Sequence, residues 1–211
     1  SDTSGKRGVY TFCMCPGGSV VAAASEENTV VVNGMSRHAR DGANANSALV
    51  VSVLPEDFGG DFTKAIEFQR KLERAAFMAG GKNYKAPCQT VGRFLSGKAG
   101  FDFGRVVPTY PIGVTGANFD DILPGFVTGG LRRSLPILDG KLPGFAAADS
   151  VLTGVETRTS SPRRVLRGED LQSNIKGLYP AGEGAGYAGG IMSAAVDGVK
   201  IAQYICSVYK P

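Results

Sequence analysis

Apolar and polar side chains alternate with a helical period in three stretches of the 211-residue chain. Residues 61–79 repeat apolar positions every three to four residues, and this spacing predicts a helix that Asp61 caps and Gly80 ends. A second helical stretch covers 118–142, where Pro136 is expected to kink or break it. The third stretch runs from Gly190 to Val208.

Other stretches favour β-structure. Residues 9–32, 49–54, 151–159 and 178–181 read as strands, with turns expected at 16–18 and at Asn33–Gly34. The polar stretch 33–47 is expected to form a long loop. Helices and strands in one chain predict a mixed α+β fold.

Composition narrows the function classes. A net charge of +4 permits an anionic ligand but lacks the strong basic stripe of a nucleic-acid-binding protein. The four cysteines have neither the spacing of a zinc site nor that of a disulfide framework, so no metal is expected and a reducing cytoplasm is the simplest location. No signal peptide and no membrane-spanning run are expected.

The most informative stretch lies near the C-terminus and reads GLYPAGEGAGYAGGIMSAAVDGVK. Gly184, Gly186 and Gly189 form a literal G-x-G-x-x-G between a predicted strand and a predicted helix. Such a loop lets backbone N–H groups approach an anion at a helix N-terminus. No βαβ unit and no distal acid follow it, so it predicts a second contact element for a cofactor whose main site lies elsewhere. The alternative is a glycine-rich turn that only packs a helix closely.

The same stretch resembles the C-terminal cofactor motif of FAD-dependent dehydrogenases in the broad glutathione-reductase-like flavoprotein class. FCMCPGG, NGMS, NANSALVV and GVETRTSSP are similar to a group of uncharacterised members of that class. The resemblance implies FAD as cofactor. It implies a site made by the Gly182–Glu183 pair, with a carboxylate that meets a ribityl hydroxyl, and by the loop and helix start after it, namely Gly182, Glu183, Gly184, Gly186, Gly189, Gly190 and Ile191.

The resemblance also implies a domain organisation. Residues 1–148 would be an inserted, β-rich substrate-side domain, and 149–211 the returning strand, loop and helix of a Rossmann-like FAD-binding domain. The N-terminal part of that domain is absent from this sequence. The chain is therefore expected to be the C-terminal portion of a longer flavoprotein, with that missing portion as its partner, and to be inactive alone.

Candidate substrate-side residues carry two interpretations each. Cys13 and Cys15 are either a redox pair or nucleophile beside the flavin, or two small buried side chains. Amide and hydroxyl groups that could hydrogen-bond a substrate or a flavin edge, or simply build turns, come from Asn33, Ser36, Asn44 and Asn46.

A basic cluster follows the last predicted long strand. Its guanidinium groups would suit an anionic substrate or a nicotinamide phosphate, or would form a solvated turn with Glu169 and Asp170 as partners. The cluster consists of Arg158, Arg163, Arg164 and Arg167.

Together these features predict part of an FAD-dependent oxidoreductase that passes a hydride between flavin and a small-molecule substrate. NAD(P)H is a candidate electron donor. A second hypothesis is a module that binds a nucleotide or RNA phosphate without redox chemistry. A third is an assembly domain whose glycines serve turns.

Overall fold

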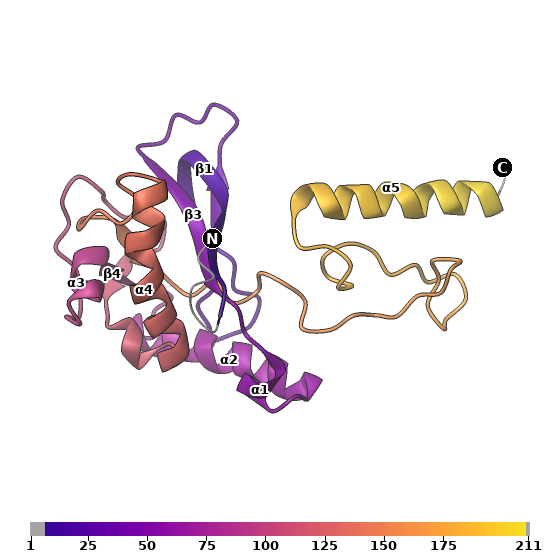
Figure 1. Ribbon diagram of the computed structural model, residues 1–211, viewed down its shortest axis with the longest axis horizontal. Helices are drawn as coiled ribbons and strands as arrows, with labels where there is room; N and C mark the ends of the chain where they lie inside the picture. The colour runs from indigo at the N-terminus through magenta and orange to yellow at the C-terminus, as the bar shows by residue number, and fades with distance from the viewer. Residues whose placement is uncertain (1–6, 210–211) are drawn as a thin grey trace. The chain divides into compact units, whose positions relative to one another are not determined.

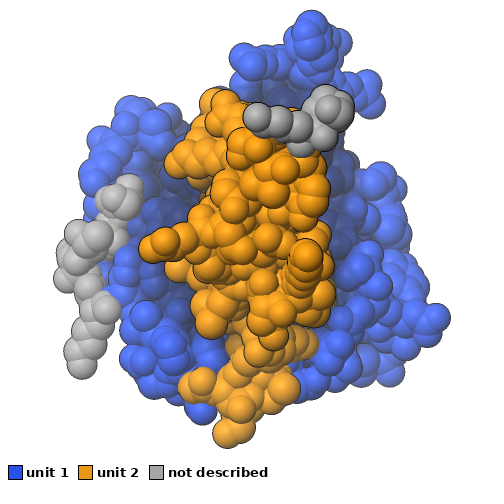
Figure 2. Space-filling view, turned by 90° about the vertical axis from the view of Figure 1, so that its right-hand side faces the viewer, with its two compact units in different colours: residues 1–59, 67–157 blue, residues 60–66, 158–211 orange. Residues whose placement is uncertain are grey.

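The computed structural model describes residues 7–209 and confirms a mixed α+β chain (Figure 1). It divides into two compact units, which are treated separately below. Unit 1 comprises residues up to Gly59 together with 67–157, and unit 2 comprises 60–66 and the residues from Arg158 onward (Figure 2). The predicted domains, in contrast, meet between 148 and 149.

The first sheet of unit 1 is antiparallel, in the order β2-β1-β3. Its strands are β1 (Val9–Ala22), β2 (Val32–Ser36) and β3 (Asn44–Val51). The turn expected at 16–18 is wrong, because β1 continues through it with a register shift on each side of Cys15. Bulges of this kind absorb an extra residue without ending a strand.

The turn expected at Asn33–Gly34 is also wrong, because both residues pair with β1 inside β2. The loop expected over 33–47 shrinks to 37–43 for the same reason. Pairing with a long central strand has overridden a local turn signal here.

The second sheet has the order β5-β4-β6, with β4 parallel to β5 and antiparallel to β6. Its strands are β4 (Ala86–Thr90), β5 (Val114–Gly116) and β6 (Val151–Thr153). The strand predicted over 151–159 is therefore confirmed only for its first three residues. The residues after Thr153 in that stretch have no strand conformation.

Five helices and one 3₁₀ turn complete the described chain. Their bounds are α1 (Pro55–Phe58), α2 (Phe62–Ala79), α3 (Val91–Leu95), η1 (Phe119–Asp121), α4 (Gly125–Lys141) and α5 (Ile191–Val208). The predicted helix at 61–79 is confirmed as α2. The one expected at 118–142 is split, since Asn118 accepts a hydrogen bond from the Asp120 N–H to cap η1 before α4 begins. Pro136 lies inside α4 and does not break it.

One apolar core lies within unit 1. Helix α4 packs on the β1–β3 side of the first sheet, where Gly130 lets it approach Val9 and Val51 closely (Figure 1). The largest fully buried side chains include Phe94, Leu135 and Leu138. This core fixes the first sheet, and therefore the candidate residues on it, to a rigid support.

Unit 2 is built differently, from irregular backbone and α5. The strand predicted at 178–181 is wrong, because these residues have no strand conformation. A strand needs a neighbour to accept its backbone hydrogen bonds, and the described residues provide none there. The predicted helix from Gly190 is confirmed.

Helix α5 is mostly exposed. Among the described residues it is the one helix long and apolar enough to cross a membrane by length and composition, which corrects the expectation that no such run exists. One helix of this kind is weak evidence for a membrane span. Asp197 and Ile201 are its buried side chains.

Candidate functional site

The glycine-rich loop before α5 is a compact turn. The N–H of Gly186 donates to the carbonyl oxygen of Glu183, and the N–H of Tyr187 donates to that of Gly182, both at 2.9 Å. Gly182 and Gly186 have φ values of +66° and +82°, which glycine adopts without strain. The loop therefore needs glycine at these two positions for its backbone path.

The two sides of the loop differ in what surrounds them. A Cβ at Gly186 would lie 2.5 Å from the carbonyl oxygen of Arg163, whereas a Cβ at Gly184 or Gly189 would meet no atom within 4 Å. One side of the loop is thus packed against the 163–164 segment. The other side is open to a ligand.

The start of α5 is also open. No side chain caps it, and its N-cap residue Gly190 has extended backbone. Ile191 and Met192 in its first turn are 82% and 75% exposed. The backbone N–H groups of such a helix start carry partial positive charge and can bind an anion or a carbonyl oxygen. In the loop before this helix, the half-buried Glu183 carboxylate has no hydrogen-bond or ion-pair partner among residues 7–209.

The arginine cluster is used largely within unit 2. Arg164 donates to the carbonyl oxygen of Gly186 and stacks on Tyr187, and Arg163 stacks on Phe62. Arg167 pairs with Asp197. The expectation that Glu169 and Asp170 would be the partners is therefore wrong for Arg164 and Arg167. Arg158 is the first residue of this part of unit 2.

In unit 1 the structure gathers several substrate-side candidates on one face of the first sheet. The register pairs Cys15 with Asn46, and places Ser36, Gly18 and Asn44 in one row across the three strands. Directly paired residues point to the same face of a sheet. Asn33 lies outside this row, and its side-chain oxygen accepts a hydrogen bond from the N–H of the next residue, Gly34.

Most of these polar side chains are engaged by the backbone. Ser36 donates to the carbonyl oxygen of Pro16, and Asn44 donates to that of Val107 at 2.6 Å. Asn46 differs, because its carboxamide nitrogen and oxygen are both buried with no hydrogen-bond partner among the described residues. Such a group is costly in a folded protein and is uncommon away from functional positions.

Glycines make room for the Asn46 carboxamide. A Cβ at Gly34 would lie 2.1 Å from its Oδ1, and a Cβ at Gly18 would lie 2.8 Å from its Nδ2. The side chain of Asn46 therefore crosses β1 toward β2 over two residues that have no side chain. We call this arrangement of Gly18, Gly34 and Asn46 the carboxamide bridge.

Both N-terminal cysteines are thiols in the structure, with Cys13 exposed and Cys15 half-buried. Cys13 has φ +50°, a conformation that non-glycine residues seldom adopt. The two bulges of β1 flank Cys15. Strained backbone and bulges cluster at functional sites, so this end of the sheet is the candidate substrate-side surface.

Two acidic side chains near the end of unit 1 were not anticipated. Glu73 is fully buried on α2 and accepts a hydrogen bond from the Thr157 hydroxyl at 2.7 Å, and Gln69 donates to the Thr157 carbonyl oxygen. Burial raises the pKa of the neighbouring Glu156 carboxyl. In the sequence, the sign that Glu73 is unusual is an acidic residue at a position of α2 that faces the core.

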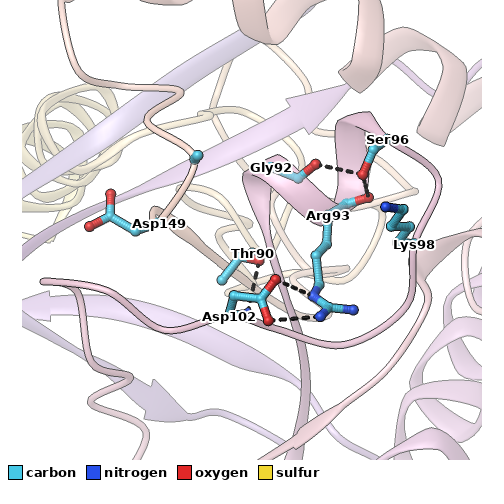
Figure 3. Close-up of a pocket in the computed structure, with 8 residues that line it drawn as sticks. Thr90, Gly92, Arg93, Ser96, Lys98, Asp102 and Asp149 are labelled. Carbon is cyan, nitrogen blue, oxygen red and sulfur yellow. Dashed lines mark hydrogen bonds and ion pairs between the residues drawn. The ribbon is translucent and has the colours of Figure 1, made fainter.

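Two cavities in unit 1 contain none of the residues predicted from the sequence. Figure 3 shows the smaller, about 290 Å³ in volume, where both Nε and Nη2 of Arg93 donate to Asp102 at 2.7 Å. Asp149 on its edge accepts from the Arg105 N–H. The larger, about 380 Å³, lies beside Tyr84 and Tyr110. Arg93 and Asp102 neutralise each other in the smaller cavity, which favours a structural role for this pair.

Comparison with known proteins adds the family. Residues 1–159 match the model of the family described as FAD-dependent protein, C-terminal domain-like. The chain is also 55% identical over 202 residues to an uncharacterized protein of Clostridium beijerinckii. That alignment covers 95% of this chain but 38% of the relative, so the chain spans well under half of its relative's length.

The two comparisons reach different parts of the chain. The family model ends close to the boundary of unit 1 at Thr157, whereas the relative's alignment is long enough to include most of unit 2. The chain belongs to the family of FAD-dependent protein, C-terminal domain-like proteins.

Proposed function

We propose that this chain is the C-terminal part of an FAD-dependent oxidoreductase, in which unit 2 contributes to the flavin site and unit 1 contributes the substrate-side surface. The observation that carries the proposal is the 182–190 loop, open on one side, that leads into the uncapped start of α5. The family description associates the chain with FAD.

The residues of unit 2 fit one end of FAD. Gly184 and Gly189 leave space for a ring system or a ribityl chain, and the Glu183 carboxylate is available to accept a hydroxyl hydrogen bond. The N–H groups at the start of α5 would stabilise negative charge on the cofactor. When bound, the flavin would supply the capacity to accept or donate a hydride.

The other end of FAD would be held by the missing N-terminal portion of the same polypeptide. The greater length of the Clostridium beijerinckii relative supports this partner. So does α5, which carries exposed apolar side chains from its first turn to its last, namely Ile191, Met192, Val196, Val199 and Val208. An apolar surface of this extent favours a protein contact.

The substrate would be a small molecule that binds at the polar end of the first sheet. The unpartnered carboxamide of Asn46 and the half-buried Cys15 thiol lie there on one face. A bound group with a hydrogen-bond donor beside an acceptor would complement the Asn46 carboxamide.

A phosphate-binding module without redox chemistry has less support. The guanidinium groups of Arg164 and Arg167 are engaged within unit 2, so fewer cations remain for a nucleotide or RNA. A cytoplasmic location stays a prediction from cysteine usage.

The test uses the full-length polypeptide of which this chain forms the C-terminal part. Purified protein should carry FAD or bind it on addition, and Glu183→Gln should weaken FAD binding about tenfold, the loss for one hydrogen bond to a charged group. Glu169→Gln, an exposed acid of the same unit, is the matched control and should leave the affinity unchanged. A folded full-length protein that ignores added FAD would overturn the proposal.

A further inference from the structure

Asp197 is an exception on α5. The helix exposes most of its side chains, yet Asp197 is 9% exposed and lies two turns from the helix start. A buried carboxylate needs hydrogen bonds and an opposite charge to offset its desolvation. Its partners therefore indicate what the residue is for.

The partners of Asp197 come from two other segments of unit 2. Arg167 donates to both carboxylate oxygens, with Nη2–Oδ1 at 2.6 Å and Nη1–Oδ2 at 3.0 Å. The backbone N–H of Gly182 donates to Oδ2 at 2.9 Å. Asp197 thus ties α5 directly to the first residue of the glycine loop.

Arg167 is fixed just as firmly. Its Nη1 also donates to the carbonyl oxygen of Pro180, and its guanidinium lies 3.7 Å from the ring centroid of Tyr187. The Arg167 N–H donates to the Tyr187 hydroxyl. The arginine therefore contacts the chain just before the loop, at Pro180, and near its end, at Tyr187.

The opposite charges of Arg167 and Asp197 neutralise each other where both side chains are mostly buried. The side chains of Arg167 and Asp197 are 13% and 11% exposed. The Arg167 guanidinium, and then the Gly182 N–H, lower the pKa of the Asp197 carboxyl to about 2. The pair is thus fully ionised at neutral pH and keeps the backbone of Gly182 in its left-handed conformation, with φ +66°.

We propose that Arg167 and Asp197 are positioning residues that hold the Gly182–Glu183 loop in its cofactor-binding geometry before the cofactor arrives. This inference rests on the proposed flavin site. It goes beyond it because neither residue belongs to the loop. Their effect on binding comes through pre-organisation, which removes an ordering cost from the binding step.

The experiment uses the full-length protein and three variants. Asp197→Asn keeps the shape and one acceptor oxygen but removes the charge. Arg167→Lys keeps the charge but loses the two-pronged contact and the stacking on Tyr187. Lys176→Arg alters an exposed cation of the same unit outside the pair and serves as the control.

Two readouts are made at a temperature where circular dichroism shows every variant folded. Asp197→Asn and Arg167→Lys should each raise the FAD dissociation constant about 10- to 100-fold. With FAD at saturation, both should also alter the visible circular dichroism of the bound flavin. The control should do neither. An unchanged spectrum at saturation, together with affinity lost only in proportion to unfolding, would reduce the pair to a stabilising role and overturn the proposal.

A third readout separates this proposal from the flavin site itself. In cofactor-free protein, Asp197→Asn should speed hydrogen exchange at the Gly182 amide at least tenfold, since that amide loses its charged acceptor. Unchanged exchange overturns the positioning role whatever the protein binds. If Asp197→Asn exchanges faster but the wild-type protein never binds FAD, the pair still positions the loop and the flavin site is rejected.

Discussion

The two units of this chain reach a defined structure by different means. Unit 1 buries an apolar core that joins two sheets and α4, whereas among described residues the apolar side chains buried in unit 2 are those of Ala65, Pro180 and Ile201. Unit 2 instead relies on ionic and backbone hydrogen bonds around Arg167 and Asp197. A core excludes water by itself, but a unit held by polar contacts leaves its apolar surface for another partner.

The largest test of this contrast is Phe94→Ala in unit 1. Phe94 is fully buried, so its loss should reduce the free energy of unfolding by about 3–5 kcal/mol. Urea denaturation measures it. Leu166→Ala in unit 2, where the side chain is 77% exposed, should change it by less than about 0.5 kcal/mol. Equal losses would abolish the distinction between the units.

A second test uses pH to address the charged pair in unit 2. The folded pKa of Asp197 is about 2, below its ordinary 3.8. A depressed pKa means that the stabilisation is complete above about pH 4 and is lost as pH falls toward 2, by about 2 kcal/mol. Asp197→Asn should flatten this acid limb in urea titrations at successive pH values. Asp102→Asn, whose side chain is 74% exposed, should alter it far less.

A third test compares two glycines of the same loop. Gly186→Ala places a Cβ against the Arg163 carbonyl oxygen at a left-handed backbone position, and should cost about 1–2 kcal/mol or more. Gly184→Ala enters open space and should cost less than about 0.5 kcal/mol. Thermal unfolding of both variants checks the difference. A larger loss at Gly184 would mean that the open side of the loop is misassigned.

The smallest effect is expected on the exposed side of α5. In the 211-residue chain, Val199→Ser should change the free energy of unfolding by less than about 0.5 kcal/mol, because the side chain is 56% exposed. In a longer polypeptide that includes the proposed N-terminal portion, the same change should cost about 1 kcal/mol or more if that portion covers this helix. Denaturation of both lengths gives the answer. An equally small change in the free energy of unfolding at both lengths would mean that no other part of the protein covers α5.

Local patterns predicted the helices better than the sheets. Helix α2 and helix α5 follow from apolar periodicity and from their flanking polar and glycine residues. The turns at 16–18 and Asn33–Gly34 failed because bulged pairing along the 14-residue β1 outweighs local turn preference. The strand at 178–181 failed because a strand depends on a neighbour that a local pattern does not reveal.

The candidate site shows the same limit. The glycine loop is contiguous, so its residues could be recognised together in the sequence. Asp197 and Arg167 lie 30 positions apart, and neither spacing nor composition indicates that they meet. A single acid within an apolar helix was the one available signal, and it gains meaning only with its partners in place.

The carboxamide bridge of unit 1 also constrains how relatives of this protein can diverge. A Cβ at Gly34 would lie 2.1 Å from the Asn46 oxygen, so alanine there requires the carboxamide to move away or a shorter residue at 46. Positions 34 and 46 should accordingly change together across descendants of a common ancestor, whereas position 18 should stay glycine whatever stands at 46, because a Cβ there would lie 2.5 Å from the Met35 carbonyl oxygen.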